Sequence, residues 1–373
     1  MNQPLLSIVI PTKNRYPYLF KLLDTIDSFN FNEVEVVIQD NNERNEPILE
    51  YFQKLGGKPS YIKYDWNKES LPISLNSDYA ILNSTGEYVC FIGDDDGVTK
   101  GIINQVKYLK NNGIEAMITR LAVYNWPDYK DDSIFSLSST LSLDNPKGKN
   151  YILYSNKELK KVAKGGGATL GLLPRVYQGV VSRAALDKLY EKCGSFFPGP
   201  SPDMANAIAL TAVVENYLYS DEPTIITGQS KFVGGGERLL KKLMNLSEIP
   251  HLPKDIMDYW DSKLPSLWCT DTIWPGSAII AAAKMEIPFK INYNKIYGRF
   301  VYNHPSYSYV INDFNVSRIK VAFYGGIVFL QKFYRWAKNR ISYYLSNKKR
   351  VNGCILYRKL DSIKQVADVL INL

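Results

Sequence analysis

The first third of the chain alternates between short apolar runs and longer amphipathic stretches, and this alternation limits the folds open to it. Apolar side chains recur at three- and four-residue spacing over residues 15–29, 47–55, 73–83 and 101–111, which indicates helices. Strand-like apolar runs flank these helices at residues 7–10, 34–38, 61–64, 87–92 and 114–119. Strands and helices in this order predict a parallel sheet with crossover helices, which is an α/β fold.

Composition narrows the class of protein. The 373 residues are 45% hydrophobic and 22% charged, which provides enough apolar surface for a large core and excludes disorder over most of the length. The most membrane-like stretch, residues 321–330, is shorter than the roughly 20 residues that cross a bilayer. No signal-peptide pattern precedes the strand-like start at residues 5–10, so we expect a cytoplasmic protein.

Few side chains other than carboxylates are suited to catalysis in this sequence. The four cysteines lie far apart without CxxC spacing, and the only histidines are His251 and His304. With two histidines, the sequence offers very few residues for a Ser-His or Cys-His nucleophile or for a histidine-rich zinc site. We therefore expect reduced, structural cysteines and a chemistry that rests on carboxylates.

Three consecutive carboxylates follow the apolar run at residues 87–92. After Gly93 come Asp94, Asp95 and Asp96. Adjacent like charges raise one another's pKa, so the triplet is costly unless a cation is shared among them. Mg²⁺ and Mn²⁺ prefer oxygen ligands and often take one or two carboxylates together with substrate phosphates. The pattern favours a divalent-metal site at the end of this strand, and the alternative is an acidic, solvated turn.

Three motifs, in this order, resemble family 2 glycosyltransferases, which have the GT-A fold with a Rossmann-like nucleotide-binding sheet. They are Ser7-Ile8-Val9-Ile10-Pro11-Thr12-Lys13-Asn14-Arg15, then Val36-Val37-Ile38-Gln39-Asp40-Asn41, and then Gly86-Glu87-Tyr88-Val89 leading into the acidic triplet. The resemblance covers about residues 5–120. All three motifs fall at one predicted sheet edge, where open α/β sheets bind ligands.

The resemblance implies a donor site for a nucleotide sugar, most simply a UDP-sugar. The residues that match the family's nucleoside-binding positions are Pro11, Thr12, Arg15 and Asp40. A carboxylate such as that of Asp40 can accept hydrogen bonds from the uracil imide or from ribose hydroxyls.

The same resemblance implies that the acidic triplet contacts the donor and its metal. Asp94 and Asp95 are expected at the donor, and Asp95 and Asp96 are the expected ligands of Mn²⁺ or Mg²⁺. Such a metal stabilises the charge on a departing nucleoside diphosphate. The family often shows Asp-x-Asp-Asp, but Gly93 stands at the first acidic position here, so the register within the triplet stays open.

The resemblance also implies a general base on the acceptor side, and Asp203 is the candidate. Prolines at positions 200 and 202 fix the approach to it, and residues 204–213 read as a helix that starts directly after it. A base there would deprotonate an acceptor hydroxyl and invert the anomeric configuration. The family more often has Glu-Asp at this point, and an ordinary helix N-cap is the alternative role for Asp203.

The expected reaction transfers a hexose or N-acetylhexosamine to a growing bacterial-type surface glycan or a lipid-linked oligosaccharide. A haloacid-dehalogenase-like phosphatase that uses Asp94 and Asp96 is one alternative, although it would need a second acidic pair, and Asp131-Asp132 lies in a polar stretch. A non-catalytic module that binds sugar nucleotides is the other alternative. No pattern of nucleic-acid binding is present.

The chain divides by pattern into a catalytic GT-A domain over residues 1–236 and a mainly helical region over 237–373. Within the first, residues 1–124 are the expected nucleotide-sugar half and 125–236 the acceptor half, with a polar loop at 125–150. Triple glycines at 165–167 and 234–236 lack the Lys-Ser or Lys-Thr of a P-loop, so we interpret them as flexible loops or lid hinges.

Basic charge is concentrated near the C-terminus. Of the formal net charge of +8, the segment 317–350 supplies nine Lys or Arg residues and no Asp or Glu. Aromatic and aliphatic residues are interleaved with these charges over 318–350, as in helices that lie on anionic membranes. The alternative is a C-terminal helix whose apolar side packs on the catalytic domain.

Overall fold

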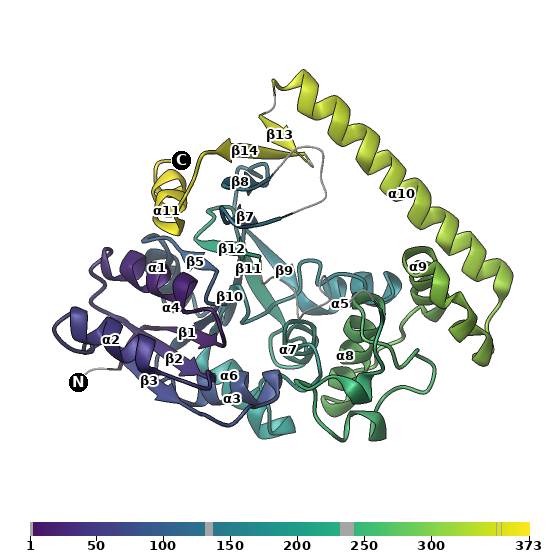
Figure 1. Cartoon of the computed structure of the whole chain (residues 1–373), viewed down its shortest axis with the longest axis horizontal. Coiled ribbons are helices and arrows are strands. Elements are labelled where there is room, and N and C mark those ends of the chain that lie inside the picture. Colours follow the sequence, from purple (N-terminus) through teal and green to yellow (C-terminus); the bar gives the residue numbers. More distant parts are fainter. Residues whose placement is uncertain (1–2, 131–136, 232–241, 348, 352) are drawn as a thin grey trace.

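A mixed eight-stranded sheet with helices on both faces forms the centre of the molecule (Figure 1). The computed structural model describes residues 3–130, 137–231, 242–347, 349–351 and 353–373. The Asp131-Asp132 pair and the glycine run at 234–236 lie outside the described residues.

The observed elements confirm the α/β pattern predicted for the first 120 residues. The strands are β1 (Leu6–Thr12), β2 (Val34–Asp40), β3 (Ile62–Trp66), β4 (Tyr88–Phe91), β5 (Gly97–Val98), β6 (Ala116–Thr119), β7 (Ala122–Asn125), β8 (Thr140–Leu143), β9 (Tyr151–Tyr154), β10 (Gly179–Ser182), β11 (Asn216–Ser220), β12 (Ile225–Gln229), β13 (Arg350–Val351) and β14 (Cys354–Arg358). The helices are α1 (Tyr16–Asp27), α2 (Glu46–Lys54), α3 (Ile73–Leu82), α4 (Ile102–Asn111), α5 (Ser155–Lys164), α6 (Arg183–Cys193), α7 (Pro202–Leu210), α8 (Thr270–Lys284), α9 (Tyr293–Asn303), α10 (Arg318–Leu345) and α11 (Ile363–Ile371). Short 3-10 segments lie at Leu246–Glu248, Ile256–Asp258 and Pro305–Asp313.

The strand order of the main sheet is β3-β2-β1-β4-β10-β6-β11-β9. The first four strands in this order are parallel, and β10 runs antiparallel to both β4 and β6. The register pairs Thr12 with Asp40 at the ends of β1 and β2, and Val9 with Phe91 at the end of β4. The loops that follow these three strands therefore meet at one edge of the sheet.

Alternating side chains of the main-sheet strands point into two hydrophobic cores, one on each face of the sheet. Leu6, Ile8 and Ile10 of β1 face a core that includes buried residues of α1, α2, α4 and α11, whereas Val9 faces a second core with residues of α3, α6 and α7. A strand that is buried on both faces reads as a continuous apolar run, which is the pattern of a parallel sheet between helices. This three-layer arrangement, with the helical region that follows it, is the predicted GT-A fold.

A second, six-stranded sheet of order β13-β14-β8-β7-β12-β5 joins the C-terminal end of the chain to the first half. Strand β8 pairs with both β7 and β14, so the interpretation of residues 125–150 as a loop alone was wrong. Thr140 and Leu141 are buried in this sheet although the surrounding sequence is polar. Figure 1 shows α11 beside α1, and Ile363 of α11 belongs to the first core.

The region after residue 242 is mainly helical up to the end of α10. The Asp271 carboxylate of α8 accepts from Asn303 of α9 at 2.7 Å, and Asn303 in turn accepts from Lys332 of α10 at 2.7 Å. The expected boundary at 237 stays a proposal, but β14 and α11 return to the first half of the chain. Within the described residues, no helix has both the length and the hydropathy of a membrane span.

The glycine run at 165–167 ends helix α5 instead of forming a hinge. Gly166 and Gly167 have positive φ angles of 73° and 62°, which favour glycine. A Cβ atom on Gly167 would lie 3.1 Å from the Cα atom of Pro275 in α8. The run is therefore a closely packed helix end, and the flexible-hinge interpretation was wrong for it.

Candidate active site

The acidic triplet lies at the carboxyl edge of the main sheet, just after β4. Asp94 is fully buried, and Asp95 and Asp96 are 5% and 1% exposed. The alternative of a solvated acidic turn is therefore wrong. Three buried carboxylates in one loop need donors or cations close by, because an unpaired buried charge is costly.

Arg15, which directly precedes α1, supplies the nearest positive charge. Its Nε lies 2.8 Å from Asp94 Oδ1, and its Nη1 lies 3.2 Å from Asp95 Oδ2. Burial alone would lower the pKa of Arg15, but the carboxylates of Asp94 and Asp95 outweigh that effect and raise it. Thr12 Oγ1 donates to Asp94 Oδ2 at 2.7 Å. The structure thus brings together Thr12, Arg15, Asp94 and Asp95, which were all expected at the donor site. Pro11, a further expected residue, directly precedes Thr12 in β1.

Asp96 is bound on all sides by protein donors. It accepts from the Gly93 amide at 2.8 Å and from the Gly228 amide at 2.7 Å, while Gln178 Nε2 lies 3.1 Å from both of its oxygens. Burial raises the pKa of Asp96, and the neighbouring Asp95 raises it further. These contacts make Asp96 an anchor that fastens the triplet loop to β12.

Asp95 has a different environment from its neighbour. Ser230 Oγ donates to Asp95 Oδ2 at 2.8 Å, and the Trp126 indole donates to the Asp95 backbone carbonyl at 2.8 Å. The side chain of Asp95 therefore contacts the Arg15 guanidinium and the Ser230 hydroxyl, which both belong to side chains. This exchangeable set of partners distinguishes it from Asp96.

The fit of Mn²⁺ or Mg²⁺ can be judged from these contacts. Among the described residues, no three His, Cys, Asp or Glu side chains are grouped so that they could hold a metal ion by themselves. Mg²⁺ usually needs only one or two carboxylates when substrate phosphates complete its shell. Asp95 fits that requirement, whereas the oxygens of Asp96 are already occupied by amide donors. Asp94 Oδ1 accepts no hydrogen bond, but Arg15 Nε lies 2.8 Å from it, so the guanidinium already neutralises this oxygen.

Asp40 lies at the end of β2, but its carboxylate is occupied by neighbours. The hydroxyls of Tyr16 and Tyr64 donate to Oδ2 at 2.6 and 2.9 Å. The backbone and side-chain nitrogens of Asn42 donate to Oδ1 at 2.9 and 2.6 Å. Asp40 is fully buried. Its expected contact with a nucleoside stays a prediction, and in this structure Asp40 holds the loop after β2.

Asp203 is the second residue of α7, and Ser201 is the N-cap residue of that helix. The N-cap role considered for Asp203 is therefore wrong. Its Oδ1 accepts from the Met204 amide at 2.8 Å and also from the Ser201 hydroxyl. Burial raises the pKa of Asp203, although these two donors oppose the rise. A carboxyl group with a raised pKa is closer to the range in which a general base works.

Residues 175–178 connect the triplet to Asp203. Burial raises the pKa of Tyr177 well above its ordinary value, and the carboxylates of Asp96, Asp95 and Asp203 raise it further. The phenol therefore lies within electrostatic range of both acidic groups. Nothing in the local sequence around Tyr177 marks it as a site residue.

The position of this segment is fixed from both sides. The amide of Phe91 donates to the Val176 carbonyl at 3.1 Å, and the Gln178 amide donates back to Phe91 at 2.8 Å. On the other side, Asn206 of α7 accepts from the Val176 amide at 2.9 Å. These bonds hold the end of β4 and helix α7 at fixed positions relative to one another. The sequence motifs do not indicate Tyr177, Gln178 or Ser230 as residues of the site.

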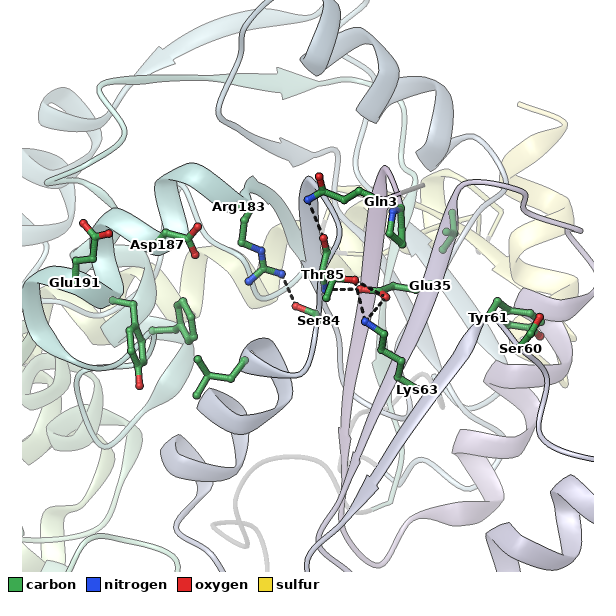
Figure 2. A pocket seen from close by; sticks show the side chains of 15 residues that line it. Gln3, Glu35, Ser60, Tyr61, Lys63, Ser84, Thr85, Arg183, Asp187 and Glu191 are labelled. Atoms are coloured by element: carbon green, nitrogen blue, oxygen red, sulfur yellow. Dashed lines mark hydrogen bonds and ion pairs between the residues drawn. The ribbon is translucent and has the colours of Figure 1, made fainter. Parts of the chain in front are cut away.

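A cavity of about 1010 Å³ lies at the opposite, amino-terminal edge of the sheet (Figure 2). Glu35 lies within it and contacts Lys63 at 2.8 Å, and it also accepts from Ser7, Thr85 and the Gly86 amide. Burial alone would raise the pKa of Glu35, but the bonds from Lys63 and Ser7 hold it below its ordinary value. Figure 2 shows Glu35 with its partners Lys63 and Thr85. Ligands of open α/β sheets bind at the carboxyl edge, which is where the triplet lies.

Comparisons with known proteins support the resemblance of the first part of the chain to family 2 glycosyltransferases. Residues 7–163 match the model of the family described as glycosyl transferase family 2. A curated relative, the GalNAc(5)-diNAcBac-PP-undecaprenol beta-1,3-glucosyltransferase of Campylobacter jejuni, is 28% identical over 111 residues, which are 30% of this chain. The match spans 36% of the length of that relative.

Two solved structures of TarS from S. aureus also align with the chain. The UDP-GlcNAc complex of TarS 1-349 has a TM-score of 0.47 at 14% identity, covering 81% of this chain and 73% of that chain. The UDP complex has a TM-score of 0.41 at 14% identity, covering 82% of each chain.

Proposed function

We propose that the chain, whose residues 7–163 match the model of glycosyl transferase family 2, is an inverting glycosyltransferase that uses a nucleotide sugar, UDP-linked by preference. The proposed acceptor is a hydroxyl of a growing surface glycan or of a lipid-linked oligosaccharide. The observation that carries the proposal is the cluster of Arg15, Asp94 and Asp95, which lies at the carboxyl edge of the sheet within the family domain.

The donor site is proposed around this cluster. Arg15 is 26% exposed at its side chain, so its guanidinium can reach a phosphate while it still contacts Asp94. Arginine pairs well with phosphate because its planar fork of N–H groups matches the oxygen geometry. When bound at Asp95, a divalent ion supplies further positive charge for the diphosphate. The UDP preference rests on the family resemblance.

Asp203 is the proposed general base. Its carboxylate accepts the proton of the acceptor hydroxyl while the hydroxyl oxygen forms a bond to the anomeric carbon. The bond from that carbon to the diphosphate oxygen breaks on the opposite face, and the configuration inverts. Support comes from the raised pKa of Asp203 and from the shared electrostatic contact of Tyr177 with Asp203 and Asp96.

The choice of acceptor is supported by a relative. The name of the Campylobacter jejuni protein describes a glucosyltransferase that acts on a PP-undecaprenol-linked glycan. We propose a lipid-linked or surface glycan for this chain as well, with residues 1–124 binding the donor and residues 125–236 the acceptor. The mainly helical part, residues 237–373, is proposed to complete the acceptor side and to carry the contact with a membrane.

Incubation with a nucleotide sugar labelled in the sugar, together with a lipid-linked glycan fraction, tests the function. Transfer of label to the lipid fraction with release of nucleoside diphosphate is the expected result, and Asp203→Asn should abolish it. Release of inorganic phosphate from a phosphate ester without transfer would favour a phosphatase that uses Asp94 and Asp96. Binding of the donor without turnover, with every acceptor fraction, would favour a non-catalytic binding module.

A further inference from the structure

Helix α10 lies along the outer edge of the molecule (Figure 1). Its inner side contacts the rest of the chain: Val321 and Tyr343 are 5% and 7% exposed, and Lys332 donates to Asn303 of α9 at 2.7 Å. Among the described residues of the helix, Val321 and Tyr343 are the only buried ones. A helix of this length therefore presents most of its surface outward.

The outward surface is apolar along one stripe. With about 100° of rotation per residue, positions 319, 323, 330, 334 and 341 fall on one side of the helix, about opposite Val321. The stripe consists of Ile319 (83% exposed), Phe323 (62%), Leu330 (62%), Tyr334 (67%) and Ile341 (60%), together with Phe333 (57%), which borders these five positions on one side. Contiguous exposed apolar side chains of this size mark a binding surface.

Basic side chains border the stripe. Lys320 and Lys338 fall along one margin of it, and Arg340 falls along the other. The Arg340 guanidinium lies 5.0 Å from the Trp336 ring, and Lys338 Nζ lies 6.0 Å from the ring of Tyr334. Long cationic side chains that lie against aromatic rings can keep their charge in water while their stems cover apolar surface.

The charge pattern decides between two occupants. The stripe spacing of three and four residues would also suit a helix from a second copy of this chain. Such a pairing would place the basic margins of both helices against one another, and residues 317–350 contain no Asp or Glu to offset them. An anionic lipid surface satisfies the apolar stripe and the basic margins together.

We propose that α10 is a membrane-docking helix that lies in the plane of an anionic bilayer, with the stripe in the acyl boundary and Lys320, Lys338 and Arg340 at the phosphate level. This docking deepens the membrane contact proposed above for residues 237–373. Its test uses no activity, so its failure would leave the proposed sugar transfer untouched. For an enzyme with a lipid-linked acceptor, this contact would hold the protein at the surface where the acceptor is found.

The test is sedimentation of the full chain with vesicles of pure phosphatidylcholine and with vesicles that contain phosphatidylglycerol. We expect recovery in the pellet with the anionic vesicles alone, and release as salt is raised. Equal recovery with both lipids, or no recovery with either at low salt, would overturn the proposal. Point variants are preferable to a truncation before Arg318, because the truncation would also remove β14 and α11 from the fold.

Two variants separate the stripe from its margins. Leu330→Glu with Phe333→Glu changes the stripe, and Lys320→Glu with Lys338→Glu changes one margin. Each should lower the partition coefficient onto anionic vesicles at least tenfold. The first removes apolar side chains from the acyl boundary, and the second replaces two cations near the anionic surface with anions. Circular dichroism confirms that each variant is folded.

Matched controls on other exposed faces should bind as the wild type does. Leu49→Glu replaces an apolar residue that is 49% exposed on α2, and Lys54→Glu with Lys160→Glu repeats the charge change elsewhere. If stripe variants bind vesicles normally, the proposal is wrong. If light scattering shows a dimer that only the stripe variants dissociate, while vesicle binding is unchanged, the stripe pairs with a second copy instead.

Discussion

Arg15 Nε lies 2.8 Å from Asp94 Oδ1, and this contact places the positive charge of one loop against the buried carboxylate of another. The sequence alone suggested that a divalent metal would offset the adjacent carboxylates. The structure shows that the protein already contributes a cation of its own. The charge balance of the site therefore rests on Arg15 before any ligand is bound.

The first prediction concerns this ion pair. Arg15→Gln should lower the free energy of unfolding by about 3 kcal/mol, because it leaves the buried Asp94 without a compensating charge. Urea denaturation of the wild type and the variant measures the difference. The double variant with Asp94→Asn should recover most of the loss, and an Arg15→Gln protein as stable as the wild type would contradict the assignment.

The second prediction separates Asp96 from Asp95. Asp96→Ala should lower the free energy of unfolding by about 3 kcal/mol, since it leaves the buried amides of Gly93 and Gly228 without an acceptor. On charge repulsion alone, the sequence predicts no such loss. Asp95→Asn keeps the side-chain shape and should be about as stable as the wild type. Equal urea midpoints for Asp96→Ala and the wild type would show that Asp96 is not an anchor.

The third prediction concerns Asp203. Asp203→Asn should lower kcat by at least about a hundredfold while donor affinity is kept, because Asn cannot accept the proton. Burial raises the pKa of Asp203, so kcat of the wild type should fall as the pH drops through that raised pKa and the carboxyl group becomes protonated. Ser201→Ala removes a hydroxyl donor from Asp203 and should move the acid limb of the pH profile to higher pH. An active Asp203→Asn enzyme would refute the general-base role.

The fourth prediction tests how closely β12 approaches the triplet. A Cβ atom on Gly228 would lie 1.7 Å from the Asp95 carbonyl oxygen, a distance that no side chain tolerates. Gly228→Ala should therefore lower the melting temperature by several degrees or prevent folding. Gly326→Ala is the control, because nothing lies within 4 Å of a Cβ atom there. Similar melting temperatures for the two variants would mean that the Gly228 contact is not needed.

Much of the fold could be predicted from the sequence, because buried parallel strands and amphipathic helices leave clear periodic patterns. Residues 7–10 and 34–38 are typical of buried strands because every side chain in them except Ser7 and Glu35 is apolar. Strand β8 was missed for the opposite reason. It has four residues within a polar stretch, and its partner β14 comes from more than 200 positions later in the chain.

The site was predicted only as far as its motifs reach. Thr12 and Arg15 are expected from the family resemblance, and Asp94 and Asp95 from the acidic triplet after an apolar run. The structure brings these four side chains together, and their roles at a donor stay predictions. The contacts that distinguish Asp95 from Asp96 come from β12 and from Gln178, and such long-range contacts leave no local pattern. The sequence therefore predicts both as metal ligands, and this stays a prediction; the amide donors on Asp96 are the reason that we propose Asp95 alone.

Binding of UDP, measured by titration calorimetry with and without Mn²⁺, tests the account most directly. The account predicts that the wild type binds UDP more tightly with Mn²⁺, and that Asp95→Asn loses this gain. Arg183→Gln, which changes the cavity at the opposite edge of the sheet, should bind UDP as the wild type does. Absence of UDP binding, or normal Mn²⁺-dependent binding by Asp95→Asn with loss in Arg183→Gln, would contradict the placement of the donor site at Arg15 and the acidic triplet.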